Sequence, residues 1–95
     1  MKILALEKEL PGASAEDYTK YAEAEARQVW QLIKENKIRE IYFRQNQDCA
    51  VILLECQDTE DANHILETLP FVNNKLIHFE FFALKPYPGL ERLFK

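Results

Sequence analysis

The sequence predicts one small α+β domain in which a strand, a helix, two strands, a second helix and a last strand follow one another. Two observations support this prediction. Two stretches place apolar residues at helical spacing, and four short runs are rich in β-branched and aromatic residues. A length of 95 residues fits a single domain, with a C-terminal tail over residues 86–95. This order of elements is the ferredoxin-like arrangement, an antiparallel sheet with both helices on one face.

Short sequence signals mark the first strand and the first helix. An apolar, β-prone run lies within residues 1–7, and the Pro-Gly pair at positions 11 and 12 marks a loop. Ser14 precedes Asp17 by three positions, which is the spacing of a capping box. The helix is therefore expected to begin at residue 15 and to continue to about Asn36, a stop signal.

A hairpin is expected after this helix. Residues 38–45 alternate and contain β-branched and aromatic side chains, so they predict a strand. The polar residues 46–48 predict its turn, and residues 49–56 form a nearly continuous apolar run typical of a central strand.

The second helix is expected to start at the acidic run 58–61, and Pro70 is expected to end it. His64 lies opposite its apolar face and should be exposed to solvent. Residues 75–84 predict the last strand. The expected apolar face of this helix consists of Ala62, Ile65, Leu66 and Leu69.

Composition and charge exclude several classes of function. The net charge is −4 and no cluster of Lys and Arg is present, which argues against binding to nucleic acid or to an anionic membrane. No run approaches the ~20 apolar residues of a membrane span, and the N-terminal residues do not resemble a signal peptide.

The cysteines and the absence of cofactor motifs point to a reduced, cofactor-free protein. Cys49 and Cys56 lie in one expected strand, where seven residues at ~3.3 Å each span roughly 23 Å, beyond the reach of a disulfide. Free thiols predict a cytoplasmic location. No zinc-ligand spacing, glycine-rich phosphate loop or nucleophile-elbow serine occurs, so neither a metal nor a cofactor is expected.

One face of the predicted sheet is both apolar and ionisable. Period two places Ile41 and Phe43 on the helix-covered face, together with Ile77, Phe79 and Phe81 of the last strand. The opposite face mixes apolar and ionisable side chains. Such a face is too adhesive to be left in water, so we expect a homodimer or a higher homo-oligomer formed through it. The opposite face carries Glu40, Tyr42, Arg44, Leu76, His78, Glu80 and Phe82.

Glu25 is the residue most out of place in the sequence. At about 100° per residue it falls near the centre of the apolar stripe of the first helix. An ionised carboxylate in such a position must find a partner, reach a cavity or take up a proton. The stripe consists of Tyr18, Tyr21, Ala22, Val29, Leu32 and Ile33.

Three segments carry a resemblance to a known family. Residues 69–71 (Leu-Pro-Phe), followed by the last strand and by residues 84–88 (Leu-Lys-Pro-Tyr-Pro), resemble the C-terminal half of muconolactone isomerases. The helix segment from Glu23-Ala24-Glu25 to Leu32-Ile33-Lys34-Glu35 and the strand 39–44 are also similar, so the resemblance covers most of the chain. Arg44 is displaced by one residue from the family pattern, and the turn 46–48 lacks the family's glycine.

This resemblance implies a dimeric α+β barrel, in which two ferredoxin-like sheets pack face to face and some members assemble up to decamers. It also implies the chemistry of the isomerases, which move a proton on a small unsaturated lactone without metal or cofactor. An acidic residue of the family matches Glu25.

Glu25 is the expected general base, since a carboxylate in an apolar pocket has its pKa raised toward the working range. The alternative is a structural ion pair with Arg27, Arg39 or Arg44 at a subunit contact. A cavity beside Glu25 would support the general base, and an arginine beside it would support the structural ion pair.

Four further residues are expected to assist. Arg44 would hold a substrate carboxylate, or else pair with Glu80 or Glu40. His78 would shuttle a proton, or else pack at an interface. Tyr21 would orient the substrate, and Tyr42 would donate to a developing enolate oxygen.

The leading functional prediction is therefore cofactor-free proton transfer on a small unsaturated lactone or related organic acid, bound between the first helix and the sheet or near a subunit junction. A non-catalytic ligand-binding or assembly module is the alternative. A third prediction is a cofactor-free monooxygenase, whose drier pocket would be lined by Trp30, Phe43 and Phe79; Trp30 is also a candidate contact for the substrate.

Overall fold

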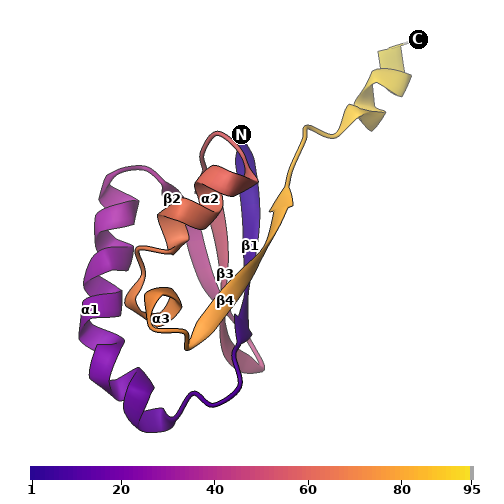
Figure 1. Ribbon diagram of the computed structural model, residues 1–95. Helices are drawn as coiled ribbons and strands as arrows, with labels where there is room; N and C mark the ends of the chain where they lie inside the picture. The colour runs from indigo at the N-terminus through magenta and orange to yellow at the C-terminus, as the bar shows by residue number, and fades with distance from the viewer. Residues whose placement is uncertain (95) are drawn as a thin grey trace.

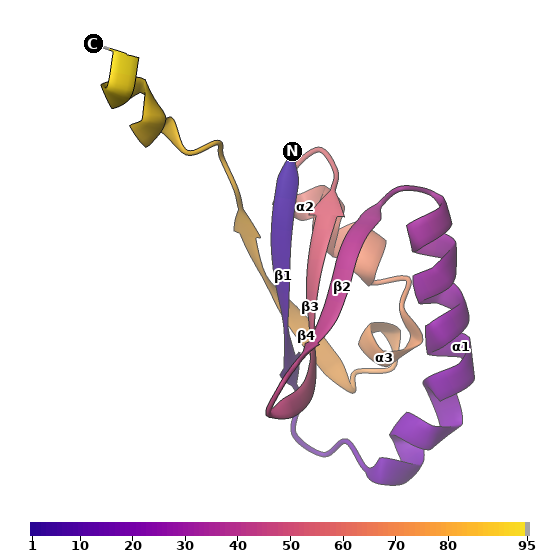
Figure 2. The ribbon, with the colours of Figure 1, turned by 180° about the vertical axis from the view of Figure 1, so that it is seen from behind.

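The computed structural model describes residues 1–94; residue 95, the last of the predicted tail, lies outside the described residues. The four strands form one antiparallel sheet in the order β2-β3-β1-β4. All three α-helices lie on one face of this sheet (Figure 1), and the view from behind displays the other face (Figure 2). The predicted ferredoxin-like α+β fold is confirmed. Its elements are β1 (Lys2–Glu9), α1 (Ala15–Lys34), β2 (Ile38–Arg44), β3 (Gln47–Glu55), α2 (Thr59–Leu66), α3 (Pro70–Asn73), β4 (Ile77–Ala83) and the 3-10 helix η1 (Pro88–Phe94).

Helix α1 begins and ends where its sequence signals place it. The Ser14 hydroxyl accepts the N–H of Asp17 while the Asp17 carboxylate accepts the N–H of Ser14, which is the predicted capping box. The helix ends at Lys34, and Asn36 takes a positive φ of 63°, a conformation that Asn tolerates better than most residues. None of the helices among residues 1–94 combines the length and the hydropathy needed to cross a membrane.

The hairpin turn is shorter than predicted. Arg44 pairs with Gln47, so the turn is made by residues 45 and 46 alone, and β3 begins two residues before the expected start. A register shift between Ile38 and Glu40 marks a bulge at Arg39. Because of this extra residue, Ile38 and Ile41 both reach the helix-covered face although they are three positions apart.

Pro70 begins a helix and does not end one. Helix α2 stops at Leu66, and Pro70 is the first residue of α3, where its missing N–H costs nothing. The last strand begins at Ile77, later than predicted, because Lys75 has a φ of 65° and breaks the extended backbone. Leu76, predicted on the open face, is instead 5% exposed and belongs to the core.

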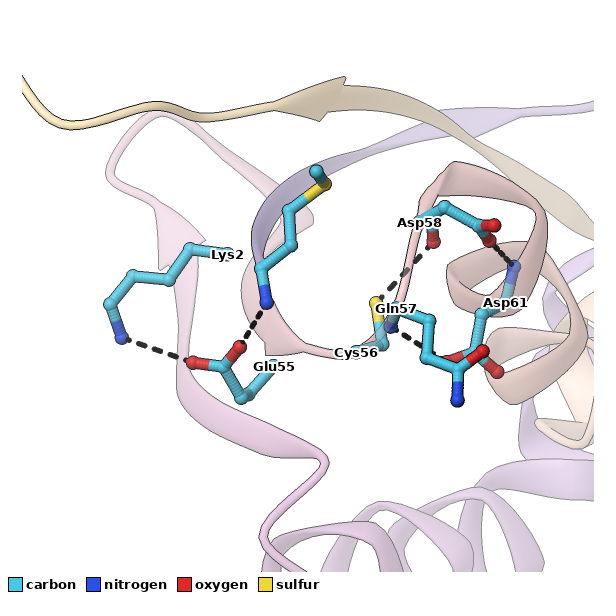
Figure 3. A network of polar contacts seen from close by, with 7 residues as sticks. Lys2, Glu55, Cys56, Gln57, Asp58 and Asp61 are labelled. Carbon is cyan, nitrogen blue, oxygen red and sulfur yellow. Dashed lines mark hydrogen bonds and ion pairs between the residues drawn. The ribbon is translucent and has the colours of Figure 1, made fainter.

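The ends of β1 and β3 and the start of α2 are joined by polar contacts (Figure 3). The Glu55 carboxylate lies 2.6 Å from the α-amino group of Met1 and 3.7 Å from Nζ of Lys2. The hydrogen bond from that amino group lowers the pKa of Glu55. Beyond it, the side chain of Asp58 caps α2 by accepting the N–H of Asp61. These contacts hold together one end of the two central strands, β1 and β3.

The open face of the sheet is a continuous apolar centre with a charged rim. The pairings align Leu53, Leu4 and Phe82 in one row across β3, β1 and β4. A second row aligns Tyr42, Val51 and Leu6 across β2, β3 and β1. Tyr42 and Phe82 are 61% and 44% exposed, so this face presents large apolar side chains to solvent in a single chain.

The C-terminal segment projects away from the domain (Figures 1 and 2). The radius of gyration is 15.4 Å, larger than the roughly 12–13 Å expected of a compact chain of this length. Four apolar side chains of this segment are at least 60% exposed: Tyr87, Leu90, Leu93 and Phe94.

Candidate functional site

A cleft of about 670 Å³ lies between α1, α3 and the covered face of the sheet. Its volume is in the range of small-molecule sites. Most of its wall is apolar, with Val29 contributed by α1, Ile41 and Phe43 by β2, and Phe79 by β4. Phe71 of α3 closes one side. The fold therefore leaves an apolar space where the ferredoxin-like helix layer meets its sheet.

Glu25 faces this cleft from the middle of α1. Its side chain is half-buried, and its Oε1 accepts the N–H of Phe71 at 2.9 Å. Burial raises the pKa of Glu25; the Phe71 N–H opposes that rise, and the charge of Glu7 adds to it. No salt bridge among the described residues involves Glu25, and Arg27 pairs instead with Glu23 at 2.6 Å. Glu25 therefore lies beside a cavity and is not paired with an arginine.

Glu7 is a second cleft carboxylate that the sequence reasoning did not identify. The ladder between β1 and β3 ends at Leu6 and Val51, and beyond it Glu7 Oε1 accepts the N–H of Ala50 at 2.9 Å. Burial raises the pKa of Glu7 despite this hydrogen bond. The sequence contains a signal that could have identified Glu7, because the alternation of side chains along β1 places it on the same face as Ile3 and Ala5.

The remaining polar groups of the cleft lie on both of its walls. Glu9 continues the β1 series, Asp48 comes from β3, and Thr19 from α1. The Tyr18 hydroxyl donates to the carbonyl of Leu76 at 3.3 Å, a long contact for an O–H donor. Burial raises the pKa of Tyr18, whose ring meets Phe71 edge to face at 5.2 Å.

Three of the predicted site residues lie on or beside the open face, away from Glu25. Arg44 and Tyr42 belong to the outward series of β2, and the Tyr42 hydroxyl donates to Glu40 at 2.8 Å. His78 is on the edge strand β4 and lines a separate hollow of about 390 Å³ with Lys75. Within one chain, none of these three residues lines the cleft.

Two other predicted residues lie on α1 but outside the cleft lining. Trp30 is 59% exposed, and Nζ of Lys34 lies 5.9 Å from its ring centroid. Tyr21 is half-buried against the core, with Nζ of Lys20 5.3 Å from its ring. Of the six residues selected from sequence, only Glu25 lines the cleft.

The donor groups of the cleft do not form a metal site. Within residues 1–94, no group of three or more His, Cys, Asp or Glu side chains has an arrangement that could hold a metal ion.

Comparisons with known proteins support the fold that was expected from sequence. The chain is similar in structure to muconolactone isomerase, with a TM-score of 0.75 and 16% identity over 94% of this chain and 93% of that one. It is also similar to 5-chloro-2-hydroxyhydroquinone dehydrochlorinase from Burkholderia phenoliruptrix AC1100, solved with 2,5-dihydroxybenzoquinone. That match has a TM-score of 0.71 and 16% identity over 94% of this chain and 98% of that one.

No family model matches the sequence, and no curated protein matches it. The fold is that of the muconolactone isomerase-like proteins, as the resemblance in sequence predicted.

Proposed function

We propose that this protein catalyses cofactor-free proton transfer on a small unsaturated ring bound in the cleft, with Glu25 as the general base. The observation that carries the proposal is the position of Glu25, a half-buried carboxylate facing an apolar cavity with one oxygen held by a backbone N–H. Its raised pKa makes it a stronger base than a solvated glutamate, which suits abstraction of a proton beside a carbonyl. Both similar structures bear names that refer to small rings.

The proposed reaction on a β,γ-unsaturated lactone moves one proton. Glu25 removes it from the carbon beside the carbonyl, the electron pair enters a dienolate, and the carboxyl returns the proton to the far end of that system. The double bond moves into conjugation, and no oxidant or reductant is consumed.

The test uses α-angelica lactone, an uncharged ring that undergoes this rearrangement. In D₂O, the wild type should catalyse conversion to the conjugated isomer, followed by NMR, and deuterium should enter at the carbon that receives the proton to the extent that the Glu25 carboxyl exchanges with solvent before it returns the proton. Glu25→Gln should reduce the rate by about 10²–10⁴, the contribution of a positioned general base. Equal rates in the two proteins would refute the assignment of Glu25.

A second proposal concerns assembly. The apolar rows of the open face and the exposed apolar side chains of the tail support a homo-oligomer formed through both surfaces. A stable pair buries about 800 Å² on each partner, which the open face and the tail would supply together. Arg44, Tyr42 and His78 would then lie at or beside the contact between copies, where they act structurally.

The assembly proposal is tested by placing a charge in the apolar centre of the open face. Leu6→Lys should lower the mass measured by light scattering to that of one chain while leaving the circular dichroism spectrum unchanged. Lys8→Glu, on the charged rim of the same face, is the control and should keep the oligomer. A wild-type protein that is monomeric at micromolar concentration would refute this proposal.

We also propose a cytoplasmic location, supported by the two free thiols, Cys49 and Cys56.

A further inference from the structure

The charged residues described along the cleft are all acidic. Among the described residues that line it, four are carboxylic acids, Glu7, Glu9, Glu25 and Asp48, and none is Lys, Arg or His. The acids come from β1, α1 and β3, so they surround the space from both walls and are not confined to one element. The predicted substrate partner Arg44 points away from this space on the opposite face of the sheet.

A ligand carboxylate would find no partner in this cleft. Moving an anion from water into a partly desolvated space is costly unless a cation or several N–H donors receive it. The two backbone N–H groups identified at the site, those of Phe71 and Ala50, are already taken by Glu25 and Glu7. The neighbouring carboxylates would add repulsion, which is not fully screened for Glu7 and Glu25 because these two are half-buried.

The same groups favour a different ligand. Each glutamate uses Oε1 for its backbone donor, which leaves Oε2 as an acceptor for a hydroxyl group. Phe43, Phe71 and Phe79 supply flat apolar contacts for a ring. Against these aromatic and aliphatic walls a hydroxyl group is cheaper to desolvate than an ionised group.

We propose that the cleft selects an uncharged ring that carries hydroxyl groups and rejects rings that carry a carboxylate. This inference rests on the proposed function only in taking the cleft as the ligand site, and it does not depend on turnover. It replaces the organic acid expected from sequence by a neutral substrate, and it assigns Glu7 and Glu25 as the groups that distinguish the two.

The experiment compares matched ring probes on the full chain in its native assembly. Resorcinol and 3-hydroxybenzoate share a ring and one hydroxyl group and differ in whether the second substituent is neutral or anionic at pH 7. Saturation-transfer NMR titrations should give an affinity for resorcinol at least about tenfold higher, as expected for an anion placed beside half-buried carboxylates. Equal or tighter binding of 3-hydroxybenzoate overturns the proposal. So does tighter binding of the cation 3-hydroxybenzylamine, or binding of neither ring at millimolar concentration.

Two pairs of variants locate and explain the discrimination. Ala26 lines the cleft and Ala24, also exposed on α1, does not. Ala26→Phe should therefore abolish resorcinol binding while Ala24→Phe keeps it; the same effect in both variants would place the probe elsewhere and overturn the proposal. Ala22 also lines the cleft. Ala22→Lys supplies the missing cation and should strengthen 3-hydroxybenzoate binding several-fold, while Ala24→Lys should not.

These outcomes separate the inference from the proposed function. Resorcinol selectivity without isomerisation of the lactone would leave the ligand class standing and refute proton transfer. Isomerisation accompanied by preferred binding of 3-hydroxybenzoate would support proton transfer and refute the ligand class.

Discussion

Replacing Glu25 by glutamine and by alanine separates its chemistry from its structural contact. The glutamine side chain keeps a carbonyl oxygen that accepts the N–H of Phe71, now 2.9 Å from Glu25 Oε1, and removes a charge from the half-buried site. Alanine leaves that N–H without its partner. Because the net value of such a hydrogen bond is about 1 kcal/mol, the alanine variant should be less stable than the glutamine variant by about that amount.

For a domain of this size, about 1 kcal/mol corresponds to a difference of about 4–8 °C in Tm, which differential scanning calorimetry resolves. The rate of lactone isomerisation should fall in both variants by a similar factor, since neither retains a base. A purely structural role for Glu25 predicts the opposite pattern, in which Glu25→Gln keeps whatever turnover the wild type has. Equal stability of the two variants would refute the importance of the Phe71 contact.

Three further predictions follow from the same geometry. The charge of Glu7 raises the pKa of Glu25, so Glu7→Gln should move the acidic limb of the pH–rate profile to lower pH; an unmoved limb would contradict this coupling. The pKa of Glu25 is higher in the folded protein than in the unfolded chain, so the folded state binds more protons. The stability that this contributes is present below the unfolded pKa of 4.5 and is lost as pH rises through the folded pKa. Denaturant titrations should therefore show a weaker fall in stability with rising pH in Glu25→Gln, and an unchanged slope would refute this. Finally, Leu93→Ser combined with Phe94→Ser should weaken the oligomer in sedimentation experiments and change the stability of the isolated domain by no more than about 0.5 kcal/mol, because both side chains are exposed in one chain.

The sequence determined the order of the four strands and the two longer helices, and the unusual character of Glu25. Ser14 and Asp17 fixed the start of α1 through local hydrogen bonds, and the apolar spacing of α1 fixed which side faces the sheet. Local signals of this kind act within a few residues, so they can be identified without knowing the rest of the fold. The same spacing placed Glu25 on the buried side, where the structure has it.

Only the tertiary structure decided what surrounds that carboxylate. The nearest donor, the N–H of Phe71, is 46 residues away in sequence, and the Ala50 N–H that holds Glu7 is 43 residues from it. The pairing of β1 between β3 and β4 places Glu7 and Glu9 in the cleft, whereas Arg44 and His78 do not line it. Such neighbours are set by strand order and register, which depend on the packing of the whole chain and have no local signal.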